Sequence, residues 1–273
     1  MNAWRFLDTG PAKGAYNMAV DEALLEGAAT GTPVLRVYAW QPPAVSFGYG
    51  QQPWREVDLD RCREAGIEVV RRLTGGRAVL HWDELTYSVL CREDDSQCGG
   101  PISHTYRRIG EALVEGLRLF GVAVALERAQ PRALRPREAG VSEPCFSSLA
   151  RWEIKCRGRK LIGSAQRRVR GAILQHGSLL TGPRHRALLD LLPPGAAGGD
   201  GAKRLEEGST FLGECIAGPV DLARLTACLA EGFGRCLEVE MQPGQLSPGE
   251  QVRAAELMHT QYGNPAWTGA VQR

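Results

Sequence analysis

Cysteine is the side chain in this sequence best suited to covalent chemistry, because its thiolate is a strong nucleophile. The 273 residues contain eight cysteines, and no two of them form a C-x-x-C pair. That spacing favours free thiols over a disulfide framework, and most of them are expected to be small buried apolar residues. Cys145 is the strongest candidate for a nucleophile, because it lies at the edge of a predicted loop and just before a basic segment. Cys156, Cys228 and Cys236 remain weaker alternatives.

Lysine is rare in this chain, which draws attention to the few positions that have it. Of the 33 basic residues only four are lysine, at positions 13, 155, 160 and 203. Unlike arginine, lysine can lose its proton and act as a base. Lys160 is followed by the apolar Leu161 and Ile162, which favours a functional role. The alternative, a surface lysine paired with a neighbouring strand, remains open at this point.

Two glycines flanked by arginines form another candidate site. Gly75 and Gly76 lack a Cβ, so a carbonyl or phosphate group can approach the backbone, while Arg72 and Arg77 supply fixed positive charge. The spacing does not match a Walker phosphate loop. From the residues alone, a glycine turn in a β-hairpin is favoured over a ligand site.

Composition excludes several classes of protein. A chain with 43% hydrophobic and 23% charged residues is globular rather than disordered or collagen-like. It has no run of about 20 apolar residues and no apolar N-terminal stretch, so we expect a cytoplasmic location and no membrane association. The histidines do not stand at metal-ligand spacing, so no metal site is expected. Residues 151–170 hold eight basic residues against one Glu, a local charge of +7 that fits either an acidic partner or a solvated pair of strands.

The elements that must position these residues are mixed strands and helices, without strict βαβ alternation. This pattern predicts an α+β fold with a mixed, largely antiparallel sheet flanked by helices. We expect a single domain over residues 1–273, with a core at about 33–240 and a C-terminal helix at 247–262 that Ser247 caps. Strands are expected at 4–8, 34–39, 44–47, 67–73, 78–81, 85–91 and 122–126, and a meander at 152–156, 160–168 and 172–180. Further helices are expected at 15–26, 54–65, 105–120 and 222–236, a long loop at 127–144 and a surface insertion at 193–202.

Three longer segments carry a family resemblance. They are RRLTGGRAVLHWDELTYSV (71–89), GRKLIGSAQRRVRGAILQHGSLL (158–180) and QYGNPAW (261–267). In this order they resemble the lipoate ligase and octanoyltransferase superfamily, which shares its fold with biotin protein ligases. The resemblance implies the catalytic-domain fold of that superfamily, with a tunnel for a medium-chain acyl group in its mixed sheet. It also implies chemistry directed at one lysine of a lipoyl domain.

The superfamily contains ATP-dependent ligases and ATP-independent octanoyltransferases, and the local sequence favours the second group. His81 is followed by Trp-Asp-Glu-Leu-Thr-Tyr-Ser, whereas the ligases typically continue with Asp-x-Gly-Asn. The segment EPCFSSLARWEI (143–154) resembles the Cys-Phe segment of the cysteine-dependent octanoyltransferase that uses acyl carrier protein. By this resemblance Cys145 is the acyl-thioester nucleophile, and Lys160 lowers the pKa of its thiol and acts as general base. No cofactor is then required, because the acyl donor is already a thioester.

The resemblance also identifies the residues expected to bind the substrate. They are Arg72, Gly75, Gly76, Arg77, His81, Gly163, Ser164, Ala165, His176 and Gly177. The small residues at 163–165 would let an acyl chain pass, although a tight strand crossing explains them equally well.

The implied reaction moves an octanoyl group from octanoyl-acyl carrier protein to apo lipoyl domains, such as the glycine cleavage H protein or the E2 subunits of 2-oxoacid dehydrogenases. We expect a monomer that binds neither nucleic acid nor membrane. The enzymatic alternatives are an ATP-dependent lipoate-protein ligase and an octanoyl amidotransferase between lipoyl domains. A non-catalytic nucleic-acid-binding module using residues 151–170 ranks last, because Trp152 is the only aromatic residue there.

Overall fold

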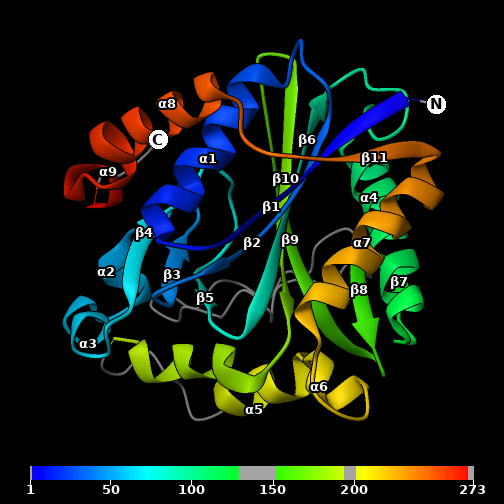
Figure 1. Cartoon of the computed structure of the whole chain (residues 1–273). Helices are drawn as coiled ribbons and strands as arrows, with labels where there is room; N and C mark the ends of the chain where they lie inside the picture. The colour runs from blue at the N-terminus through cyan, green and yellow to red at the C-terminus, as the bar shows by residue number, and fades with distance from the viewer. Residues whose placement is uncertain (1, 129–151, 194–200, 270–273) are drawn as a thin grey trace.

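The structure, a computed structural model, describes residues 2–128, 152–193 and 201–269. Its largest sheet consists of β1 (Asn2–Ala12), β2 (Val34–Trp40), β6 (Glu84–Arg92), β7 (Ala125–Arg128), β8 (Trp152–Cys156), β9 (Arg159–Val169), β10 (Ala172–Leu180) and β11 (Val239–Gly244). The strand order is β11-β1-β2-β6-β10-β9-β8-β7 (Figure 1). Strand β1 runs parallel to β2 and β11, and the other neighbouring pairs are antiparallel. The predicted mixed, largely antiparallel sheet is therefore confirmed.

A three-stranded sheet accompanies the large one and overturns one prediction. It contains β3 (Ala44–Phe47), β4 (Glu68–Arg71) and β5 (Val79–His81), in the order β4-β3-β5. Strand β3 pairs in parallel with β4 and antiparallel with β5. The predicted hairpin at the two glycines is therefore wrong: the hydrogen bonds that β4 and β5 would exchange are made to β3 instead. The glycine segment crosses from one edge of this sheet to the other.

Helices cover both faces of the large sheet (Figure 1). They are α1 (Gly14–Gly27), α2 (Pro53–Glu56), α3 (Leu59–Glu64), α4 (Ile102–Phe120), the 3₁₀-helix η2 (Pro183–Leu191), α5 (Gly201–Gly208), α6 (Leu212–Cys215), α7 (Leu222–Leu237), α8 (Pro248–Leu257), the π-helix η3 (Met258–Tyr262) and α9 (Pro265–Gly269). Leu35 and Val89 pack in the core with α4 and α7, whereas Val34 and Leu90 pack with α1 and α8. Neighbouring residues of a strand face opposite sides, so each strand supplies two cores. None of the helices in the described part of the chain is both long and apolar enough to cross a membrane.

Turn and cap residues explain where most predicted elements begin and end. The predicted meander is observed as β8, β9 and β10, joined by turns at Arg157–Gly158 and Arg170–Gly171 whose residues all have positive φ. Helix α4 ends at Gly121, whose φ of 98° stops it as expected. Ser247 caps α8 in a complete capping box.

Three predicted elements differ from those observed. The helix expected at 54–65 is divided into α2 and α3, because Asp58 accepts hydrogen bonds from the backbone of Asp60 and Arg61 and starts a new helix. The strand expected at 122–126 is β7, displaced toward Arg128. Helix α5 begins inside the insertion expected at 193–202, and residues 194–200 of that insertion lie outside the described part.

Helices α4 and α7 cross in close contact at one glycine from each helix, Gly116 in α4 and Gly232 in α7. A Cβ added at Gly232 would lie 2.3 Å from the backbone nitrogen of Gly116. We therefore expect Gly232→Ala to force the helices apart and to lower the free energy of unfolding by about 1–3 kcal/mol. Gly249→Ala in α8 is the control, because its Cβ would meet no atom within 4 Å. Chemical denaturation of both variants tests this, and equal stability of Gly232→Ala and wild type would contradict it.

Candidate active site

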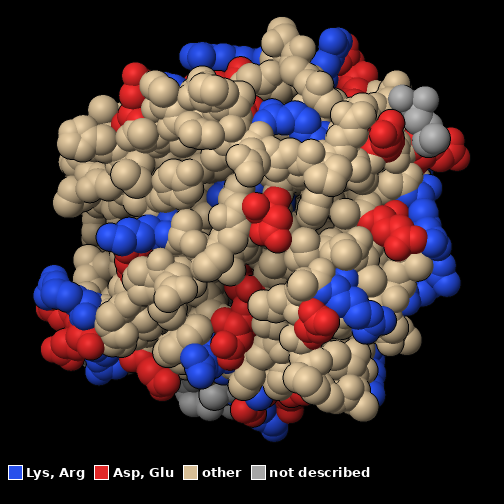
Figure 2. All heavy atoms as spheres, in the orientation of Figure 1, with Lys and Arg blue, Asp and Glu red and all other residues tan. Residues whose placement is uncertain are grey.

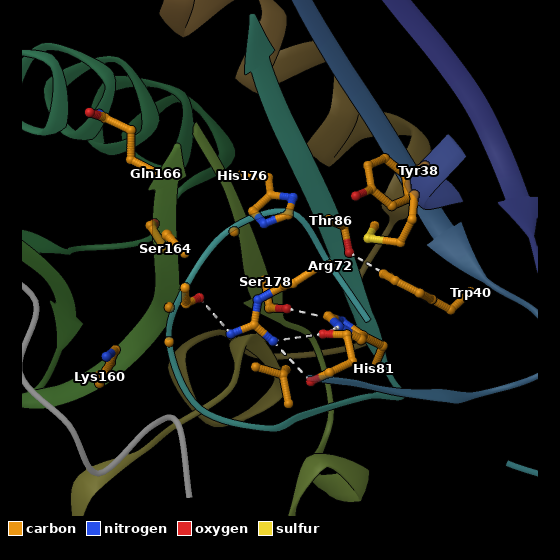
Figure 3. A pocket seen from close by; sticks show the side chains of 18 of the residues that line it. Tyr38, Trp40, Arg72, His81, Thr86, Lys160, Ser164, Gln166, His176 and Ser178 are labelled. Carbon is orange, nitrogen blue, oxygen red and sulfur yellow. Dashed lines mark hydrogen bonds between the residues drawn. The ribbon is translucent and has the colours of Figure 1, made fainter. Parts of the chain in front are cut away.

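A cavity of about 300 Å³ lies between the two sheets, near the lower limit for small-molecule sites (Figure 3). It brings together nine of the ten residues expected to bind substrate, together with Lys160. The nine are Arg72, Gly75, Gly76, His81, Gly163, Ser164, Ala165, His176 and Gly177. The tenth, Arg77, does not line the cavity, but its carbonyl accepts a hydrogen bond from the Arg72 guanidinium at 2.8 Å. Cys145 lies outside the described residues.

Strand register places the second motif along one wall. Ala165 pairs with His176, and Ser164 pairs with Gly177, so β9 and β10 present these residues side by side. Gly177 cannot be larger, because an added Cβ would lie 2.7 Å from the ring of Tyr87 and 2.6 Å from the carbonyl oxygen of Gly163. At Gly177 the small residue therefore permits the close approach of the Tyr87 ring and of the Gly163 backbone.

The buried guanidinium of Arg72 shapes the glycine segment from inside. It donates hydrogen bonds to the carbonyl and hydroxyl oxygens of Ser46 at 2.9 and 3.0 Å and to the carbonyl of Gly75 at 2.9 Å. Its Nε donates to the Thr74 hydroxyl at 3.2 Å. These bonds satisfy the carbonyls of a segment that crosses β3 without making a hairpin. Arg72 thus fixes the cavity wall through the backbone, in addition to lining the cavity.

His81 lies on the same side of the cavity as Arg72, since the Ser46 hydroxyl contacts both side chains. Its Nδ1 donates to Glu84 Oε1 at 2.8 Å, and its Nε2 accepts from the Ser46 hydroxyl at 2.7 Å. Its ring stacks on Trp40, with centroids 3.9 Å apart and an angle of 10° between the planes. The Trp40 indole in turn donates to the Thr86 hydroxyl at 2.7 Å. These contacts fix the orientation of the imidazole ring.

His176 is fixed by a buried carboxylate that the sequence did not identify. Asp21 in α1 accepts from His176 Nδ1 at 3.2 Å and from Arg36 at 2.6 Å, and also from Tyr38 and Ser88. Burial alone would raise the pKa of Asp21, but the Arg36 guanidinium and the hydrogen bonds hold it below its ordinary value. Burial lowers the pKa of His176, so its ring is neutral and its Nε2 accepts from the Thr74 hydroxyl at 2.7 Å. The available signal was the acidic pair Asp21 and Glu22 within the otherwise apolar segment Met18–Leu25.

Lys160 lies at the other end of the view from Trp40 and Tyr38 (Figure 3). It lines the cavity, its side chain is 6% exposed, and its Nζ is 3.2 Å from Glu153 Oε1. It is therefore paired with a neighbouring strand, as one interpretation held, but the pair is buried rather than on the surface. In the sequence, Glu153 was notable only as the single negative charge of a basic segment. Its pairing with Lys160 was not predicted.

The fold also reduces the charge of residues 151–170. Lys155 pairs with Glu127 at 2.9 Å, and Arg159 pairs with Glu214 at 2.6 Å. Both carboxylates are distant in sequence, so a charge summed along the chain exceeds the charge in space. On the face shown in Figure 2, acidic and basic residues are likewise interspersed. Among the described residues, no group of three or more His, Cys, Asp or Glu is placed to hold a metal ion.

The first residue of the motif 71–89, Arg71, contacts the last residue of the motif 261–267, Trp267. The Arg71 guanidinium donates to the carbonyls of Trp267 and Thr268 at 3.1 and 2.7 Å, and to those of Tyr49 and Gln51 at 2.7 Å each. Residues 261–267 are therefore fastened to the strand that leads into the glycine segment. The fold thus brings together motifs that lie far apart in the sequence.

The sequence matches the family model for the lipoyl protein ligase A/B catalytic domain over residues 13–234. The chain belongs to this family. Among curated relatives, Octanoyltransferase LipM of Kyrpidia tusciae is 41% identical over 262 residues, covering 94% of this chain and 96% of the relative. The Symbiobacterium thermophilum protein of the same name is 41% identical over 97% of both chains, and that of Bacillus subtilis 35% over 97% of both.

Solved structures of the family have the same fold. A lipoate-protein ligase A bound with ATP superimposes with a TM-score of 0.79 at 25% identity, over 99% of this chain and 100% of the other. A bipartite lipoate protein ligase from Thermoplasma acidophilum gives 0.81 at 25% identity, over 100% and 98%. The predicted fold class is confirmed by these neighbours. The roles of individual site residues remain predictions.

Protonation of His176 should make stability depend on pH. Its pKa in the folded chain is below the ordinary 6.5, so between these two values the unfolded chain binds the proton and the folded chain does not. Its stabilising contribution is therefore complete above about pH 6.5 and is lost as the pH falls. We expect the Tm of wild type to fall between pH 7.5 and 5.5, and His176→Gln to lose less.

The exposed His259→Gln is the control for this titration. His185 contributes in the same direction, since burial lowers its pKa as well, so part of the pH effect remains in His176→Gln. Identical changes in Tm for His176→Gln and His259→Gln would contradict the assignment.

Proposed function

We propose that this chain transfers an octanoyl group from octanoyl-acyl carrier protein to the lysine of a lipoyl domain, through a thioester on Cys145. The activity is octanoyl transfer in protein lipoylation, as the relatives named Octanoyltransferase LipM match almost the full chain. The observation that carries the mechanism is the buried Lys160 at the edge of a cavity lined by nine predicted binding residues. The carrier protein as donor and Cys145 as nucleophile are the proposed parts.

The chemistry proceeds in two balanced steps. In the first, the Cys145 thiolate attacks the donor thioester, and the carrier's thiolate leaves as the acyl-enzyme forms. In the second, the lipoyl-domain amine attacks the acyl-enzyme, the Cys145 thiolate leaves, and Lys160 accepts the proton of the amine. Exchange between thioesters is nearly isoenergetic and amide formation is favourable, so no ATP is consumed. Lys160 as an ammonium favours the thiolate in the first step, and as a free amine serves as base in the second.

The cavity suits an acyl chain with a reactive end. Met18, Trp40 and Val79 supply apolar wall, whereas Lys160 supplies a charged edge. The segment that contains Cys145 joins the described chain at Trp152, next to Glu153, the ion-pair partner of Lys160. This connection supports an encounter between the Cys145 thiol and the Lys160 end of the cavity.

We propose that the acceptors are apo lipoyl domains such as glycine cleavage H protein or E2 subunits, and that the chain acts in the cytoplasm as a monomer of one catalytic domain. The exposed Arg157 and Arg170 and the half-buried Arg167 would meet acidic carrier surfaces. Competition between octanoyl-acyl carrier protein and an octanoylated lipoyl domain as donors distinguishes this reaction from amidotransfer.

An ATP-dependent lipoate ligase is the second candidate, because the neighbouring structures are lipoate-protein ligases and one of them contains ATP. The greater identity to the octanoyltransferases, 41% against 25%, favours transfer. AMP release on incubation with lipoate, ATP, Mg²⁺ and an apo lipoyl domain would establish ligation. Octanoyl transfer in the absence of ATP would show that the reaction does not require ATP and would favour the transferase.

Removing the Cys145 thiol should abolish transfer. We expect Cys145→Ala to form no octanoyl adduct in intact-mass analysis and to lower transfer by at least about 10³-fold, because the covalent route is lost. Cys228→Ala is the control, since Cys228 is a half-buried free thiol of α7. Transfer by Cys145→Ala at a rate near wild type would refute the covalent mechanism.

The two roles of Lys160 should separate in its variants. Arginine stays charged, so Lys160→Arg should form some acyl-enzyme and fail in the second step, whereas Lys160→Met should impair both. Single-turnover kinetics of each half-reaction against pH measure this, with alkylation of Cys145 to follow its thiolate. Wild-type turnover by Lys160→Arg would remove Lys160 from the mechanism.

A further inference from the structure

The ion pair between Glu153 and Lys160 is buried on both sides. The two side chains are 4% and 6% exposed, and Nζ lies 3.2 Å from Oε1. Buried ion pairs contribute little net stability, because desolvation of both charges offsets their attraction. A pair in this position is therefore poorly explained by stability alone. Its contact with the cavity through Lys160 points to a role in the reaction.

A β-bulge turns Lys160 toward Glu153. Ile154 pairs with Ile162 and Lys155 pairs with Lys160, so β9 contains one extra residue, Leu161, opposite β8. Leu161 and Ile162 consequently both enter the apolar core on the face of α4 and α7. In a regular strand Lys160 would share the face of Ile162. The bulge instead places Lys160 on the cavity face, where Glu153 also lies.

The charged residues near Glu153 compete only weakly with Lys160 for its carboxylate. Lys155 lies 3.9 Å from Glu153, but its closer partner is Glu127 at 2.9 Å. Glu127 is about half exposed, so water screens its charge, whereas Glu153 is not screened in this way.

Other elements place charged and polar groups around Lys160 without a direct contact to Glu153. Across the cavity stand Arg72, His81 and His176, each already hydrogen-bonded. Ser209 forms a β-bridge with the Lys160 backbone and bonds His185 Nε2 through its hydroxyl at 3.0 Å. In the described part of the chain, Glu153 supplies a carboxylate in direct contact with the Lys160 amine.

We propose that Glu153 is the positioning residue of the reaction: it holds the Lys160 amine at the cavity edge and sets the pH at which that amine becomes free to accept a proton. This rests on the proposed role of Lys160. A carboxylate in contact favours the ammonium, which favours the Cys145 thiolate in the first step. The same carboxylate delays the loss of that proton, so the second step waits for a higher pH or for the charge change that accompanies acylation.

The four lysines of the chain allow a direct test. With ¹³C-labelled lysine, NMR follows the Cε signals against pH, and the Lys160 signal is identified by its absence in Lys160→Met. In Glu153→Gln we expect Lys160 to lose its proton at a pH about 1–3 units lower than in wild type. Glu127→Gln is the matched control and should shift the Lys160 titration much less, because Glu127 contacts Lys155 and acts on Glu153 only through it.

Kinetics connect the titration to the reaction. In single-turnover transfer from acylated enzyme, the rise of rate with pH should begin at lower pH in Glu153→Gln, by the displacement seen in NMR. Loss of the proton from the acceptor lysine is common to all variants and does not confuse the comparison. Glu153→Asp keeps the negative charge but moves the carboxylate away from Lys160, because Asp is one methylene shorter. We therefore expect a smaller shift of the Lys160 titration and of the rate profile, in the same direction. That variant carries the test if Glu153→Gln does not fold.

Each outcome has one meaning. An unmoved Lys160 titration in Glu153→Gln, or in Glu153→Asp if that variant carries the test, overturns the proposal. So does an equal shift in Glu127→Gln, and so does a moved titration with an unmoved transfer profile. An octanoyl adduct on wild-type Cys145 shows in the same samples that the proposed function stands. Absence of that adduct would refute the proposed function itself.

Discussion

The buried carboxylate of Asp21 is the contact on which the rest of the site depends. It receives hydrogen bonds from Arg36 and Tyr38 of β2, Ser88 of β6 and His176 of β10. One side chain of α1 thereby fixes the helix to three strands of the large sheet. An unpaired charge at this depth would cost several kcal/mol, so the arrangement is stable only when all partners are present. Because His176 lines the cavity, its hydrogen bond to Asp21 also fixes this part of the cavity wall.

From Asp21 a continuous series of hydrogen bonds joins the two sheets. His176 leads to Thr74 and Arg72, and the Ser46 hydroxyl then joins Arg72 to His81. The glycine segment between β4 and β5 lies in the middle of this series. Since it spans both edges of the small sheet, its conformation is set by side-chain donors rather than by a local turn. The polar wall of the cavity is therefore held from behind, while Met18, Trp40 and Val79 leave other parts apolar.

What the sequence could predict follows from how local each signal is. The meander of β8, β9 and β10 was predictable because two-residue turns and strand-like runs alternate within about 30 residues. The crossing at Gly75 was not predictable, and a hairpin was expected there instead, because β3, which separates β4 from β5, comes from residues 44–47. Asp21 and Glu153 were missed for the same reason: only the fold reveals what a single carboxylate faces. The family motifs located the cavity residues, because such motifs record the three-dimensional site in sequence, whereas the role of Cys145 remains a prediction.

The ion pairs around Lys155 have a consequence for the acyl group that the proposed reaction places on Cys145. Lys155 stands on the strand that follows the Cys145 segment, yet its amine is engaged by Glu127 at 2.9 Å and lies 3.9 Å from Glu153. An ammonium has no lone pair with which to attack a thioester, and the guanidinium groups that replace lysine elsewhere are equally inert. With 29 of its 33 basic residues arginine, the chain presents few amines to its own acyl group. In the proposed reaction, this composition limits the number of amines that the acyl group of the enzyme could reach.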